Sequence, residues 1–84
     1  MSLNAAENEI LIYLLSNQWK NFSEIRQNTS LGQYALNTAL NSIDKLGLVE
    51  ERRGDRNSRE FNLTAKGRDV AEAVKALQEM LRQA

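Results

Sequence analysis

The clearest pattern of apolar and polar positions along the chain lies between Gln33 and Leu46. Leu36, Leu40 and Ile43 recur there at spacings of four and three residues, which places them on one face of a helix. At about 100° per residue, the opposite face carries amide, phenol and hydroxyl groups and only one cation. Its members are Tyr34, Thr38, Asn41 and Lys45, with Asn37 beside them. The pattern predicts an amphipathic helix over residues 33–46 whose outer face is rich in hydrogen-bonding groups.

A second helix is predicted near the start of the chain, from Ala5 to Ser16. Its centre reads I-L-I-Y-L-L, so it is apolar on nearly all sides and should be buried on more than one of them. Asn4, followed three residues later by Glu7, has the pattern of a capping box at its start. Ile12 points almost opposite to the face shared by Ile10 and Leu14, so it needs a cover of its own.

A short helix is predicted between these two, over Phe22–Asn28. Asn21 and Glu24 have the spacing of a second capping box. The connection before it has room for one short strand. Trp19 lies in that connection and, as a large apolar side chain, is expected to belong to the core.

The second half of the chain predicts a β-hairpin. Gly47 ends the long amphipathic helix, and Leu48–Arg53 reads as a strand. G-D-R-N-S is a turn cluster, and the second strand, Arg59–Leu63, alternates with Phe61 and Leu63 on one face. The hairpin tip is therefore expected to be exposed.

A last helix is predicted from Ala65 onward, with Thr64 as its N-cap. Its apolar stripe consists of Val70, Val74, Leu77 and Leu81 at spacings of four, three and four residues. The stripe should first of all be part of the intramolecular core. Its second expected use is dimerisation, because Ile12 also needs cover.

Three helices followed by a hairpin form the winged helix-turn-helix arrangement. The stretch A-L-N-S-I-D-K-L-G-L-V-E-E-R-R-G-D-R-N-S-R-E-F-N-L-T-A-K-G-R resembles winged-helix transcriptional regulators of the MarR type and their small archaeal and bacterial relatives. Three marks carry the resemblance: K-L-G-L-V-E at Lys45–Glu50, the Arg-rich hairpin with Asp55-Arg56, and L-T-A-K-G-R at Leu63–Arg68. The resemblance covers about residues 10–74.

The resemblance implies binding of double-stranded DNA as a homodimer. By position, the major-groove residues would be Gln33, Tyr34, Asn37, Thr38 and Asn41. The hairpin, as the wing, would reach the backbone or the minor groove with Arg56 near its tip. Family members often have a basic residue where Thr38 stands, and the extra dimerising helices of MarR proteins are reduced here to the terminal helices.

The arginines of the hairpin have two interpretations. Arg52, Arg53, Arg56 and Arg59 lie close together in sequence, and guanidinium groups bind phosphates well. Alternatively, they form exposed ion pairs with the acids of the same hairpin, which are Glu50, Glu51, Asp55 and Glu60. Likewise, the outer face of the helix is either a contact surface or an ordinary polar surface, and Tyr34 either contacts DNA or packs on the preceding turn.

Composition narrows the function classes. The 84 residues indicate one domain, 1–84, and the formal net charge is zero, which disfavours a non-specific DNA coater. Because the chain lacks Cys and His, zinc sites and the usual catalytic triads cannot be built. We expect no enzyme, no cofactor, no metal, no small-molecule ligand and no membrane span, in a cytoplasmic protein.

The sequence therefore predicts an α+β, mainly α, winged helix-turn-helix domain with a C-terminal dimerisation helix. It is interpreted as a homodimeric transcriptional regulator, with recognition helix 33–46 and wing 50–60. One alternative is a winged helix that binds another protein. Another is a fragment of a longer regulator.

Overall fold

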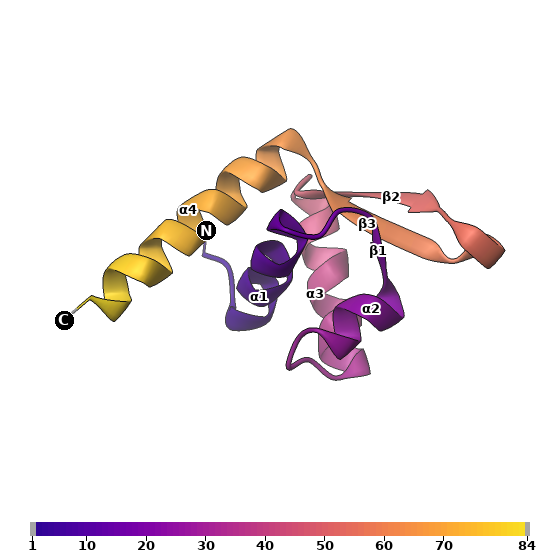
Figure 1. Cartoon of the computed structure of the whole chain (residues 1–84), viewed down its shortest axis with the longest axis horizontal. Coiled ribbons are helices and arrows are strands. Elements are labelled where there is room, and N and C mark those ends of the chain that lie inside the picture. The colour runs from indigo at the N-terminus through magenta and orange to yellow at the C-terminus, as the bar shows by residue number, and fades with distance from the viewer. Residues whose placement is uncertain (1, 84) are drawn as a thin grey trace.

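The computed structural model describes residues 2–83, and every predicted element is present in it (Figure 1). The elements are α1 (Ala5–Leu15), β1 (Lys20–Asn21), α2 (Phe22–Gln27), α3 (Gln33–Lys45), β2 (Val49–Arg53), a 3-10 turn (Asp55–Asn57), β3 (Arg59–Leu63) and α4 (Ala65–Arg82). Helices predicted to end at Ser16, Asn28 and Leu46 end one residue earlier, because these residues are the C-caps. The mainly helical α+β winged-helix fold is confirmed.

Local side-chain chemistry explains where the helices begin. Asn4 accepts a hydrogen bond from the Glu7 amide at 2.8 Å, and Glu7 accepts one from the Asn4 amide at 2.8 Å. Asn21 and Glu24 make the same reciprocal pair at 2.8 and 3.0 Å. Both predicted capping boxes are therefore confirmed. In contrast, the N-cap of α3 is Gly32, which has no side chain to cap the helix.

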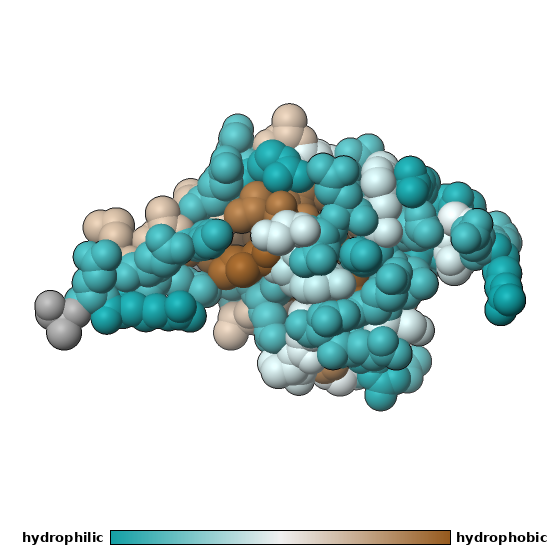
Figure 2. Space-filling model, in the orientation of Figure 1, coloured by the Kyte–Doolittle hydropathy of each residue, from teal (hydrophilic) through white to brown (hydrophobic). Residues whose placement is uncertain are grey.

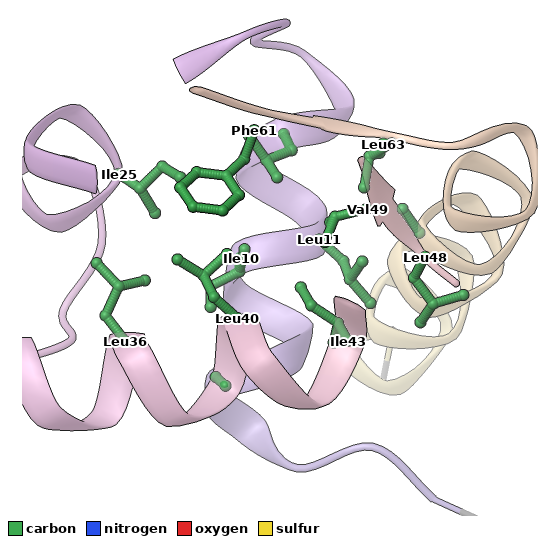
Figure 3. Close-up of a cluster of buried hydrophobic side chains, with 13 residues drawn as sticks. Ile10, Leu11, Ile25, Leu36, Leu40, Ile43, Leu48, Val49, Phe61 and Leu63 are labelled. Carbon is green, nitrogen blue, oxygen red and sulfur yellow. The ribbon is translucent and has the colours of Figure 1, made fainter. Parts of the chain in front are cut away.

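The core surrounds α1, as the apolar nature of this helix predicts. Ile10, Leu11 and Leu14 are fully buried, on the sides of α1 that pack against α3, α4 and the sheet. Figure 3 shows side chains from α2, α3 and the two long strands converging on the same cluster. The other buried apolar residues are Ile25, Leu36, Ala39, Leu40, Ile43, Leu48, Val49, Phe61, Leu63 and Ala71.

The sheet has three antiparallel strands in the order β1-β3-β2. Val49 pairs with Leu63 over the core, and Arg53 pairs with Arg59 at the far end of the hairpin. The hairpin thus extends beyond the helices at one end of the molecule, while α4 extends beyond them at the other (Figure 1). We call residues 50–60 the wing.

The structure does not place Trp19 in the core. Its side chain is half-buried and lies outside the core cluster. The backbone at Trp19 has φ of 53°, so the chain turns sharply there, and the ring lies 4.1 Å from the Arg52 guanidinium. The prediction was wrong because a single side chain's hydrophobicity does not reveal a backbone turn that directs it toward the wing.

Only the first half of α4 belongs to the core. Val70 packs against the core and Ala71 is buried, but Leu77 is 56% exposed and Leu81 is 76% exposed. Met80 is 67% exposed. The expected intramolecular role of the whole stripe is thus wrong for its C-terminal half, because α4 runs past the end of α1 (Figure 1).

Candidate nucleic-acid interface

The helix α3 divides into a buried and an exposed face. Leu36, Ala39, Leu40 and Ile43 are buried. The six candidate DNA-contacting residues of the helix are all exposed; they are Gln33, Tyr34, Asn37, Thr38, Asn41 and Lys45. Tyr34 is 84% exposed, so its ring does not pack on the preceding turn. The structure thus presents one uninterrupted hydrogen-bonding face on α3.

Two shallow grooves border this face. One lies at the start of α3 and is lined by Phe22, Gln33, Tyr34 and Asn37. The other lies toward its end, beside the N-terminal segment, and is lined by Ser2, Leu3, Glu7, Thr38, Asn41, Ser42, Lys45 and Leu46. The sequence pattern did not indicate that residues 2–3 border the exposed face of α3, because they precede the first periodic element.

Two of the four wing arginines form ion pairs across the hairpin. Arg52 Nε lies 2.9 Å from a carboxylate oxygen of Glu60. Arg59 donates to both oxygens of Glu51, at 2.6 and 3.1 Å. For these two arginines, the ion-pair interpretation of the hairpin is correct.

The other two wing arginines, Arg53 and Arg56, have no carboxylate partner within residues 2–83. Arg53 donates to the backbone oxygen of Asn57 at 3.0 Å. Arg56 is exposed at the tip, in the left-handed backbone conformation with φ of 56°. Arg53 and Arg56 are therefore the wing cations most available to a phosphate.

The Arg59–Glu51 pair changes the acid–base properties of both groups. The hydrogen bond from Arg59 lowers the pKa of the Glu51 carboxyl below its ordinary value. The same bond raises the pKa of the Arg59 guanidinium, and the negative charge of Asp44 on α3 adds to that effect. Both partners are thus charged at neutral pH, and the pair lies within the electrostatic reach of α3.

A third groove lies between the wing and the start of α2. Its lining residues are Asn21, Phe22, Ser23, Arg53, Asn57, Ser58 and Arg59. The groove exists because β1 pairs with β3, which brings residues 20–21 beside residues 60–61. Sequence reasoning missed it, since these two segments lie about forty residues apart in the chain and neither carries a signal of the other.

The described part of the chain contains neither a metal-binding cluster nor a membrane-spanning helix. Residues 2–83 contain no group of three or more acidic, His or Cys side chains placed to hold a metal ion. No helix within this range is both long and apolar enough to cross a membrane.

Comparisons with known proteins agree with this architecture. Residues 7–84 match the model of the HxlR-like helix-turn-helix family. No curated protein sequence matches the chain. A MarR-family transcriptional regulator from Silicibacter pomeroyi has a similar structure, with a TM-score of 0.83 and 23% identity over 98% of this chain and 59% of that one.

Two further solved structures are similar. MepR, a transcription regulator of the Staphylococcus aureus multidrug efflux pump MepA, has a TM-score of 0.86 and 14% identity, over 98% of this chain and 62% of MepR. F-93 of SSV1 has a TM-score of 0.73 and 22% identity, over 99% of this chain and 96% of F-93. The chain thus spans about three-fifths of the MarR-type structures and nearly all of F-93.

The comparisons test two expectations from the sequence, the winged-helix fold and the absence of enzymatic function. At these identities the solved structures establish the fold, and it is the winged helix that the resemblance to MarR-type proteins implied. The family match and the regulators among these structures confirm the expectation that the protein is not an enzyme. By its match over residues 7–84, the chain belongs to the HxlR-like helix-turn-helix family, whose fold is that of DNA-binding transcriptional regulators.

Proposed function

We propose that the chain binds double-stranded DNA as a homodimer and regulates transcription. The observation that carries this proposal is the exposed polar face of α3 beside a projecting, arginine-bearing wing. In this proposal α3 enters the major groove, and the wing contacts the flanking backbone or the minor groove. The chain acts as one domain over residues 1–84, in the cytoplasm, and needs no cofactor or small-molecule ligand.

The side chains of α3 suit the major groove. Asn and Gln amides can make two hydrogen bonds to adenine, and hydroxyl groups can bond to several base edges. Asn37, Thr38 and Asn41 are exposed on adjacent turns. Asn and Thr are mediocre helix formers, so their presence here costs helix stability, and within residues 2–83 their side chains make no hydrogen bond that compensates. A contact with bases explains why Asn37, Thr38 and Asn41 occupy the exposed face of α3.

Direct contacts with backbone phosphates must come largely from the wing. On α3 the charge of Lys45 is offset by Asp44, so the helix itself supplies no net positive charge. Among the described residues Arg56 and Arg53 form no ion pairs, and both lie on the projecting hairpin. Two guanidinium groups so placed can bind phosphates of the backbone that flanks the major-groove contact on the side of the wing.

Dimerisation is proposed through α4. Its stripe comprises Val70, Val74, Leu77 and Leu81, and Ile12 on α1 is also only partly buried. Figure 2 shows hydrophobic surface gathered where α4 passes α1, whereas the wing is hydrophilic. A second copy would cover this surface, and two-fold symmetry would present two α3 helices to one duplex.

Binding of a fluorescently labelled duplex, followed by anisotropy at several salt concentrations, tests the proposal. The wild-type chain should bind more weakly as salt rises. Arg56→Ala should flatten the slope of log K against log salt by about 0.9, since one phosphate contact is lost. Arg82→Ala, which removes a cation at the far end of α4, is the control and should leave the slope unchanged. Absence of duplex binding at low salt would contradict the proposal.

One observation favours a second candidate, a winged helix that binds another protein. The ion pairs Arg52–Glu60 and Arg59–Glu51 leave the wing less cationic than its arginine content suggests. Selection of bound sequences from a random duplex pool separates the two functions. A DNA regulator should enrich a defined sequence, whereas a protein-binding module should enrich none.

A further inference from the structure

We propose that Glu51 and Glu60 restrain DNA binding by competing with phosphates for Arg59 and Arg52. This inference rests on the proposed DNA-binding function and goes beyond it, because it assigns a role to the acids of the wing. Each phosphate contact by either arginine would then require displacement of a carboxylate. The two carboxylates would keep binding to arbitrary DNA weak.

The geometry of the pairs supports direct competition. Arg59 uses both Nε and Nη2 to bind the two oxygens of Glu51, at 2.6 and 3.1 Å. A phosphate would be bound through the same two-pronged arrangement. Arg59 therefore cannot present this edge to a phosphate while it holds Glu51.

The second pair lies directly across the hairpin. Arg52 and Glu60 are register partners, and their side chains meet at 2.9 Å. Arg52 also lies over the Trp19 ring, 4.1 Å from its centroid. Arg59 likewise lies over the Phe61 ring, but at 5.3 Å from its centroid, so its aromatic contact is the weaker of the two. We expect Arg59 to be the easier of the two to release.

Charge balance points to the same role. The wing, residues 50–60, contains four arginines and four acids, so its formal charge is zero. A neutral wing exerts little long-range attraction on a duplex of arbitrary sequence. Both pairs are partly exposed to solvent, and such pairs are weak enough to exchange when a phosphate is brought to the right place by other contacts.

The chain offers a matched control for the test. Glu50 is exposed on the same strand as Glu51 and forms no ion pair within residues 2–83. Glu50→Gln and Glu51→Gln change the net charge of the wing equally. Only Glu51→Gln releases an arginine, so the difference between the two variants isolates the competition.

The experiment measures binding of a labelled mixed-sequence duplex to the wild-type chain and both variants at several salt concentrations. Glu51→Gln should bind about two- to five-fold more tightly than Glu50→Gln, the range expected for loss of an exposed ion pair. Its slope of log K against log salt should be steeper by up to about 0.9. Glu60→Gln should show a smaller gain, because Trp19 still holds Arg52.

The outcomes separate the inference from the proposed function. If Glu50→Gln and Glu51→Gln bind with equal affinity and the wild type binds clearly, the proposed restraint is contradicted but the DNA-binding function is not. Weaker binding by Glu51→Gln also overturns the restraint, since Glu51 would then hold Arg59 in place for DNA. No binding by any variant contradicts both. Thermal melting of each variant checks folding, and Glu60→Gln provides the same comparison should Glu51→Gln fail to fold.

Discussion

Gly67, in the first turn of α4, lies against the backbone of Leu48. A Cβ at this position would overlap the carbonyl oxygen of Leu48, which is backbone and cannot rotate away. Gly67, the glycine of L-T-A-K-G-R, is therefore required because α4 packs closely against Leu48, the residue before β2. No contact with DNA is needed to explain it.

We expect Gly67→Ala to lower the free energy of unfolding by about 1–3 kcal/mol, the usual cost of overpacking. The loss should occur even though alanine favours helices by about 1 kcal/mol over glycine. Urea denaturation measures this loss in the free energy of unfolding. Gly32→Ser is the control, because Gly32 has open space around its Cα and serine could cap α3. A Gly67→Ala variant as stable as the wild type would contradict the packing argument.

The Arg59–Glu51 pair gives the chain a defined pH dependence. Since Arg59 lowers the pKa of Glu51 in the folded state, the pair stabilises the fold above the ordinary Glu pKa of 4.5. This stabilisation should disappear as the pH falls through the folded pKa of Glu51. Because both side chains are partly exposed, its size should be below about 1 kcal/mol.

Urea denaturation of the wild type and Glu51→Gln across acidic and neutral pH measures this effect. The wild type should be the more stable at neutral pH, and the difference should shrink toward acid pH. A difference that is constant with pH, or that grows toward acid pH, would show that the Glu51 charge does not stabilise the fold.

At the scale of elements, the start of α4 is bonded to the C-terminal ends of two other helices, α3 and α1. Thr64 accepts from the Gly67 amide and donates to the backbone oxygen of Gly47 at 2.7 Å. Lys66 donates to the oxygen of Leu46 at the end of α3, at 3.0 Å. Arg68 donates to the oxygen of Leu15 at the end of α1, at 3.3 Å. Each cation thus satisfies a helix C-terminus, where carbonyl groups lack partners.

Arg68→Met, which keeps an unbranched stem of similar length, should reduce the free energy of unfolding by about 1 kcal/mol. The loss reflects an unsatisfied carbonyl at the end of α1. Arg82→Met is the matched control, because Arg82 is exposed at the other end of α4 and its side chain makes no hydrogen bond within residues 2–83. Equal stability of the two variants in urea denaturation would show that the contact with Leu15 contributes nothing measurable.

Sequence reasoning succeeded where the interactions are local. The capping boxes, the face of α3 and the left-handed Gly47, with φ of 75°, depend on residues a few positions apart. It failed where partners are distant: Arg68 meets Leu15 and Arg52 meets Trp19 only after folding. For the candidate site, the exposed residues were predicted from periodicity, but the division of the wing arginines into paired and unpaired ones was not. Cross-strand register decides that division.

At the scale of the whole molecule, the C-terminal half of α4 carries an apolar stripe that no other part of residues 2–83 covers. Leu77, Met80 and Leu81 are all more than half exposed. Leu77→Glu should shift the protein toward monomers, because a carboxylate in the covered interface would be desolvated without a partner. Light scattering over a range of concentrations measures the shift. Lys75→Gln, an equal change in net charge on the opposite side of α4, should leave the oligomeric state unchanged.

The dimer makes a geometric prediction about the DNA. Two α3 helices related by two-fold symmetry should select a pseudo-palindromic site with half-sites about 34 Å apart, one turn of the duplex. Leu77→Glu should bind the same site more weakly and should select single half-sites from a random pool, because its monomer presents one α3. Single half-sites selected by the wild type, or an unshifted affinity for Leu77→Glu, would mean that α4 does not join the two recognition helices. The exposed end of α4 would then serve a contact unrelated to DNA recognition.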